Sequence, residues 1–264
     1  MDENRACESC VKEPIGTINI VRVIAKVDEC FAANDLAQAG ETLRYWEREA
    51  RKLGDSCGLL SVLNEELGYY RRTGERDAAL AAVAEAIELL QQKGMTDRVS
   101  GATIYVNAAT TLKAFGEAER GLPYYDRAEE IYLAQGKGDS YEYAALLNNK
   151  ALALGDLKRY DEAEACYLKS IEILKAEGKH DGEIAVSYIN LAHIVFDRDQ
   201  TAYERVESLL DLAWEYINSD RQPRDANYAF VISKCAPSLR YFQRDLEADA
   251  LEEVAAEIYA AGKR

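Results

Sequence analysis

Glycines recur at the ends of helical segments at an almost constant spacing. Gly54, Gly94, Gly136 and Gly178 each follow a stretch with the apolar periodicity of a helix, and they are 40, 42 and 42 residues apart. Glycine tolerates the left-handed conformation that ends a helix, and we expect Asn218 to have the same role. The spacing therefore predicts a chain built from repeats of about 42 residues.

Each repeat divides into two helices joined by a short polar turn. Small residues recur at one position of the first helix and at one position of the second. They are Ala109, Ala151, Ala192 and Ala236 in the first helix, and Ala39, Ala79, Gly121, Ala163 and Ala248 in the second. Large apolar residues lie at neighbouring positions, which is the pattern of antiparallel helices that pack closely. The sequence thus predicts an all-α fold of about six antiparallel helix pairs.

The most regular copy resembles a known family. Asn148-Asn149-Lys150-Ala151, followed by Arg159-Tyr160-Asp161-Glu162-Ala163-Glu164, is similar to the tetratricopeptide repeat in its long form, found in kinesin light chain and many bacterial proteins. The resemblance implies a right-handed α-solenoid after a polar tail at 1–16. It covers a single array over 17–262, with units near 17–54, 58–94, 100–136, 142–178, 183–218 and 226–262.

Three residues depart from the family pattern. Glu66 and Lys150 occupy a position that is normally apolar, so we expect local helix rotation or side chains that extend to solvent. Trp46 replaces the small residue of the first unit, which fits a terminal repeat with a different outer contact.

Composition excludes several classes of function. With 47 acidic and 32 basic residues the net charge is −15, which argues against nucleic acid or an anionic membrane as partner. Only 2 His are present, so His-based metal sites and catalytic triads are not expected. We find no phosphate-binding loop and expect no cofactor. Without a signal-like start or a membrane-spanning segment, a cytoplasmic location is predicted.

The resemblance also implies where a ligand binds, because in this family the first helix of each pair lines a concave groove. Asparagine recurs there, at Asn107, Asn149 and Asn190, with Asn64 and Asn148 one residue earlier. An amide both donates and accepts hydrogen bonds, so such a ladder can pair with the backbone of an extended peptide. The alternative is that each amide bonds to neighbouring helices and fixes their packing.

Charge on the same face suggests a preference for ligands. Five cations, Arg71, Arg72, Lys113, Lys234 and Arg240, outnumber the acids predicted there, which favours an acidic peptide or a C-terminal carboxylate. Their alternative role is that of ordinary solvated side chains. His193 and Tyr241 complete the candidate groove residues, with helix packing as their alternative role.

The leading hypothesis is a non-enzymatic scaffold that binds a protein or peptide segment. A second is assembly of copies, such as a homodimer, through terminal repeats that include Trp46 and Ile258-Tyr259. A third is a peptide-signal sensor, which the resemblance suggests, without a DNA-binding domain of its own. An enzyme acting through Cys7 and Cys10 is the weakest alternative.

Overall fold

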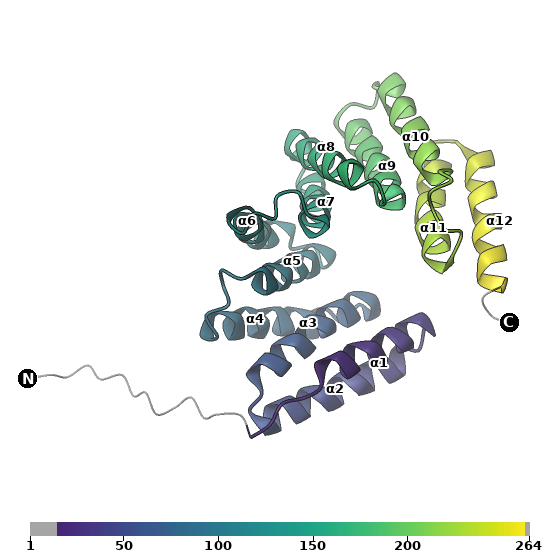
Figure 1. The fold of residues 1–264 in the computed structure, drawn as a ribbon. Coiled ribbons are helices and arrows are strands. Elements are labelled where there is room, and N and C mark those ends of the chain that lie inside the picture. Colours follow the sequence, from purple (N-terminus) through teal and green to yellow (C-terminus); the bar gives the residue numbers. More distant parts are fainter. Residues whose placement is uncertain (1–14, 262–264) are drawn as a thin grey trace, which may run out of the picture. The chain divides into compact units, whose positions relative to one another are not determined.

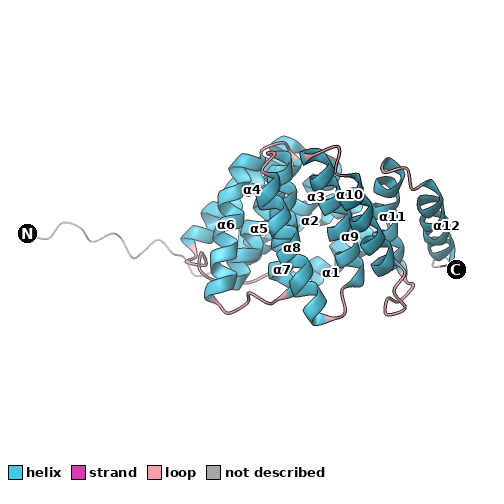
Figure 2. Cartoon of the chain, turned by 90° about the horizontal axis from the view of Figure 1, so that it is seen from above, coloured by secondary structure: helices cyan, strands magenta, loops and turns pink. Residues whose placement is uncertain are grey.

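A computed structural model describes residues 15–261, and helices with their connecting loops make up this part of the chain. The six successive pairs are α1 (Ile20–Ala32) and α2 (Leu36–Leu53), α3 (Ser56–Thr73) and α4 (Arg76–Gln92), α5 (Val99–Ala114) and α6 (Ala118–Ala134), α7 (Tyr141–Asp156) and α8 (Tyr160–Glu177), α9 (Asp181–Arg198) and α10 (Tyr203–Ile217), and α11 (Ala226–Tyr241) and α12 (Asp245–Ala261) (Figure 1). Figure 2 shows no strand among these residues. The all-α fold of helix pairs is as predicted.

The glycines of the period end helices as expected. Gly54, Gly94, Gly136 and Gly178 have φ values of 72°, 60°, 66° and 71°, in the left-handed region. The prediction for Asn218 is wrong, since its φ is −92°.

Side chains of the following loop explain why Asn218 needs no left-handed turn. Gln222 donates to the Tyr216 carbonyl at 2.7 Å, and Arg224 donates to the Ile217 carbonyl at 3.2 Å. These bonds satisfy carbonyl groups at the end of α10 that a left-handed residue would otherwise help to satisfy.

The residues form two compact units, of which the first ends at Ile131 and the second begins at Tyr132, within α6. In the first unit α3 contacts both α1 and α2, and α5 contacts both α3 and α4. In the second, α9 contacts α7, α8, α10 and α11, and α11 contacts α12. Each unit therefore holds a row of first helices with second helices packed beside them. The single array over 17–262 stays a prediction.

Small residues allow the helices to approach closely. The recurring alanines are buried, and a Cβ atom at Gly121 of α6 would lie only 3.0 Å from the Ala109 carbonyl oxygen of α5. Tyr125 of α6 also lies 2.9 Å from the Thr110 hydroxyl, measured between the two oxygens. The small residues thus mark helix contacts, as their spacing predicts.

Glu66 contradicts the expectation that its side chain extends to solvent. It is 3% exposed, and its Oε1 atom has no hydrogen-bond partner among residues 15–261. Burial, with the nearby Glu47 carboxylate as the next cause, raises the pKa of Glu66 to about 8. The carboxyl group is therefore protonated in much of the folded protein at neutral pH.

Candidate functional site

In the first unit, two of the predicted asparagines bind each other. The Asn107 side chain on α5 donates to Asn64 Oδ1 on α3 at 2.8 Å, and Asn64 donates in turn to Glu65 at 3.3 Å. Both amides are half-buried at the edge shared by the two first helices. The structure therefore brings these predicted site residues together as a direct cross-link between repeats.

The predicted cations of this unit differ in their surroundings. Arg71 donates to the Thr111 hydroxyl at 2.8 Å, and burial lowers its pKa. Arg72 is exposed, and its guanidinium carbon lies 4.5 Å from the centre of the Phe31 ring. Lys113 is half-buried near the end of α5. Arg71 is therefore a fixed part of the α3–α5 contact, whereas Arg72 is accessible.

A cavity of about 290 Å³ lies beside Asn64. Its apolar wall comes from α1, α3, α5 and the loop before α5, and Asn64 and Glu65 supply polar groups. The lining includes Ile24, Cys57, Leu60, Met95 and Ile104, together with Ser61, Ser100 and Thr103. Burial raises the pKa of Glu65, while the hydrogen bond from Asn64 lowers it. The site combines an apolar hollow with convergent polar groups, which is the usual make-up of a ligand pocket.

Sequence reasoning missed this cavity because segments far apart in the chain form it. Ile24 comes from α1 and Met95 from a loop, and neither carries a motif. Thr111 was missed as well, although it lies one helical turn after Asn107 on the same helix.

In the second unit the asparagines have three different surroundings. Asn148 on α7 accepts from the Ser187 hydroxyl on α9 at 3.0 Å. Asn149 donates to the Ala145 carbonyl of its own helix at 2.9 Å. Asn190 lies near the buried Tyr167 hydroxyl, whose pKa burial raises far above its usual range. Residues at equivalent sequence positions thus do not act alike here.

His193 belongs to an aromatic cluster formed by α9 and the C-terminal end of α11 with the residue that follows it. Its Nε2 atom lies 3.0 Å from the Ser238 hydroxyl, and its ring centre lies 5.2 Å from Tyr241 and 4.7 Å from Phe242. Phe196 makes edge contacts with both of these rings. Burial lowers the pKa of His193, which favours the neutral imidazole. Tyr241 is 57% exposed, so part of the cluster is open to solvent.

The two remaining predicted cations are also on α11. Arg240 binds three carboxylates of α12, with distances of 3.4 Å to Asp245, 2.8 Å to Asp249 and 3.0 Å to Glu252. The Lys234 ammonium group lies 5.4 Å from the centre of the Phe230 ring. Arg240 therefore has its charge neutralised within the chain, and Lys234 is exposed.

Other kinds of site find little support in the described residues. Within 15–261 no group of three or more His, Cys, Asp or Glu side chains is placed to hold a metal ion. None of the helices in that range is both long and apolar enough to cross a bilayer. Cys7 and Cys10 lie outside the described residues.

Comparison with known proteins agrees with this architecture. A family model described as tetratricopeptide repeat matches residues 142–212. No curated protein sequence matches the chain.

Solved structures share the fold at low identity. BtubC (BKLC) from P. vanneervenii is 17% identical, with 93% of each chain covered and a TM-score of 0.57. The apo form of RapI is 12% identical over 93% of this chain and 99% of that one, with a TM-score of 0.60. A Rap protein complexed with competence and sporulation factor is 15% identical over 93% of this chain and 76% of that one, with a TM-score of 0.55. Residues 142–212 are thus tetratricopeptide repeats, and the chain has the all-α repeat-solenoid fold of tetratricopeptide proteins.

Proposed function

We propose that this protein is a non-enzymatic scaffold that binds a peptide segment of a partner protein on the first helices of its repeats. The observation that carries the proposal is the cavity of about 290 Å³ beside Asn64. There the apolar hollow adjoins Asn64 and its partner Asn107, two asparagines that the sequence predicts to bind a ligand.

The chemistry of the site suits an extended peptide. The hollow between Ile24, Leu60 and Ile104 accommodates one apolar side chain. Asn64 and Asn107 hold each other through one donor and one acceptor, and an amide has further capacity to bond a peptide backbone. The mutual bond fixes both side chains before a ligand arrives, which reduces the entropy lost on binding.

The second unit offers a different kind of contact. Tyr241 and the rings beside it present a partly exposed aromatic surface, which suits an apolar or aromatic ligand side chain. Lys234 in this unit is an exposed cation that favours an acidic peptide, as does the exposed Arg72 in the first unit. The likeness in fold to a Rap protein complexed with competence and sporulation factor supports the use of such a scaffold for a signalling peptide or protein segment. A cytoplasmic location is part of the proposal.

A random peptide library displayed on phage supplies defined probes. Peptides selected on the wild-type protein are synthesised with a fluorescent label, and their affinity is measured by fluorescence anisotropy. We expect Thr103→Trp, which fills the exposed mouth of the cavity, to weaken binding by at least about tenfold. Asn107→Ala is expected to weaken it as well, by about three- to tenfold.

Gln92→Ala is the matched control, because it removes an exposed amide from the second helix α4. Circular dichroism establishes that each variant is folded. Selected peptides that bind Thr103→Trp and Asn107→Ala as tightly as wild type would overturn the assignment of this face. Failure to select any peptide would count against peptide binding itself.

A further inference from the structure

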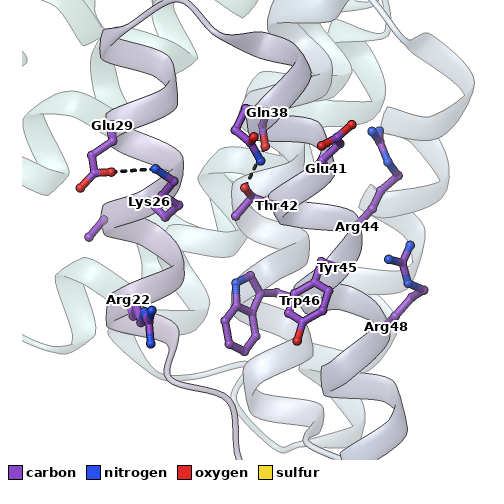
Figure 3. Close-up of a pocket in the computed structure, with 11 residues that line it drawn as sticks. Arg22, Lys26, Glu29, Gln38, Glu41, Thr42, Arg44, Tyr45, Trp46 and Arg48 are labelled. Carbon is purple, nitrogen blue, oxygen red and sulfur yellow. Dashed lines mark hydrogen bonds and ion pairs between the residues drawn. The ribbon is translucent and has the colours of Figure 1, made fainter.

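We propose that the groove between α1 and α2 binds helix α12 of a second copy of this chain. The inference goes beyond the proposed function, because it concerns a different surface. The groove encloses about 1160 Å³, and its lining residues come from α1 and α2 alone (Figure 3). Four basic residues line it, Arg22, Lys26, Arg44 and Arg48, together with two aromatic residues, Tyr45 and Trp46.

The groove is basic although the chain is acidic. Its four cations face two carboxylates, Glu29 and Glu41, whereas the chain as a whole carries a net charge of −15. Lys26 is paired with Glu29 at 3.0 Å. Arg22, Arg44 and Arg48 are exposed and have no ion-pair partner within residues 15–261. A local excess of unpaired arginine in an acidic protein favours an acidic partner.

Aromatic side chains lie between these charges. The rings of Tyr45 and Trp46 are 5.2 Å apart in an edge-to-face arrangement, and Tyr45 is 49% exposed. Figure 3 shows both rings on α2, facing the space that separates it from α1. Arginine together with tyrosine and tryptophan is the composition enriched at the centre of protein interfaces.

The way the first unit is built indicates that a helix fits such a groove. There α3 packs against both α1 and α2, and α5 packs against both α3 and α4. Those contacts use one face of each pair, whereas the residues that line the groove are exposed apart from Thr42 and Trp46, so this face of α1 and α2 is open to another helix. The groove in Figure 3 likewise lies between two neighbouring helices, α1 and α2.

Helix α12 has the complementary charge. Its sequence contains six acidic residues and no lysine or arginine. Arg240 pairs with three of the acids and Arg244 with Glu247. Glu253 and Glu257 have no ion-pair partner among the described residues, and both are exposed. Glu257 also lies near the negative end of the helix dipole, where an unpaired carboxylate is unfavourable.

The unpaired acids share one stripe of α12 with exposed apolar atoms. Helical spacing places Leu246, Ala250, Glu253 and Glu257 on the side opposite the buried Ala248, Leu251 and Ala255. Leu246 is 86% exposed. The stripe therefore offers an apolar contact for Tyr45 and Trp46 as well as two charges for the arginines.

The spacing of charges matches on the two surfaces. Glu253 and Glu257 are four residues apart on α12. The same spacing separates Arg44 from Arg48 on α2 and Arg22 from Lys26 on α1. Side chains at this spacing lie one above the other on a helix, so two ion pairs can form between two aligned helices. Each copy carries one groove and one α12, so the contact joins copies head to tail.

Charge reversal on each surface tests the contact. Sedimentation velocity of the wild type at concentrations up to about 1 mM is expected to show concentration-dependent assembly, weakened by added salt. The groove variant Arg44→Glu/Arg48→Glu and the helix variant Glu253→Arg/Glu257→Arg are each expected to weaken self-association at least about tenfold. Lys93→Glu/Lys137→Glu is the matched control, because it reverses two exposed charges elsewhere and should leave assembly unchanged.

An equimolar mixture of the two variants supplies the decisive result. The reversed groove of one variant then meets the reversed α12 of the other, and the two remaining surfaces are native. We therefore expect assembly to return in the mixture. A wild type that stays monomeric at about 1 mM, or a helix variant that assembles like wild type, would overturn the proposal, as would a mixture in which assembly stays lost.

Discussion

The Asn107 side-chain nitrogen lies 2.8 Å from Asn64 Oδ1, and this hydrogen bond joins α3 to α5. It links two successive repeats of the first unit through their amides. Arg71 adds a second link between the same helices, because it donates to the Thr111 hydroxyl at 2.8 Å. The amides of this unit are thus structural ties as well as candidate ligand contacts.

Removing that tie should destabilise the protein. We expect Asn107→Ala to lower the free energy of unfolding by about 1 kcal/mol, because one half-buried hydrogen bond is lost. Urea unfolding followed by circular dichroism measures the change. Gln92→Ala, which truncates an exposed amide on α4, should change the stability by less than about 0.5 kcal/mol. Equal stabilities of the two variants would show that the Asn64–Asn107 bond contributes nothing.

Burial of Glu66 predicts a pH dependence of stability. Charged neighbours surround it, with Arg44, Glu47 and Arg51 on α2 and Glu85 on α4. The pKa of Glu66 is about 8 in the folded protein and about 4.5 without these surroundings. Between these values the folded state binds more protons than the unfolded state. The contribution of this group to stability therefore falls as the pH rises through that window, by up to about 1.4 kcal/mol per pH unit.

Glu66→Gln isolates this contribution, because it keeps the size of the side chain and cannot ionise. We expect the variant to match the wild type near pH 4.5 and to exceed it in stability at pH 8 and above. Urea unfolding of both proteins across this pH range provides the comparison. A constant difference between the two curves would mean that Glu66 does not titrate in the window.

Two helical glycines should respond oppositely to alanine. A Cβ atom at Gly101 would lie 2.2 Å from the Met95 carbonyl oxygen, so the backbone of the preceding loop must shift. We expect Gly101→Ala to destabilise the protein by about 2 kcal/mol or more. At Gly68 the nearest atom is 3.8 Å away, on the Arg71 side chain. Gly68→Ala should stabilise α3 by about 0.5–1 kcal/mol through helix propensity, and thermal unfolding measures both.

Asp181 and Arg221 form an ion pair whose members differ in exposure. The Asp181 side chain is 1% exposed and accepts two hydrogen bonds from Arg221, at 2.7 and 2.9 Å. Arg221→Ala leaves this carboxylate buried without its partner, and we expect a loss of about 2 kcal/mol. The double variant Asp181→Ala/Arg221→Ala should lose less than the sum of the single variants in a double-mutant cycle. Additive losses would contradict a direct interaction.

The repeated helices follow from local sequence signals. Apolar periodicity and the glycines at 54, 94, 136 and 178 fix where helices form and end, because both act over a few neighbouring residues. The small residues at fixed offsets identify where helices approach, as the Gly121–Ala109 contact shows. Asn218 was the exception, because side chains of the next loop satisfy its helix end.

The sequence did not reveal which groups each side chain contacts. Asn107, Asn149 and Asn190 occupy equivalent positions in the sequence of their repeats, yet Asn107 bonds to Asn64, and Asn149 bonds to its own helix. Arg240 was expected on a ligand-binding face, and the structure surrounds it with carboxylates of α12. Such contacts depend on the offset and rotation of one helix against another.

The sequence by itself determined that this chain folds into paired helices with a 42-residue period, since that information is local and is repeated along the chain. Only the tertiary structure decided that Glu66 is enclosed, that a cavity opens beside Asn64 and that exposed arginines gather between α1 and α2. The physical reason is that burial and charge pairing belong to the packed helices together, and a side chain acquires them only when residues distant in the sequence are brought to its side.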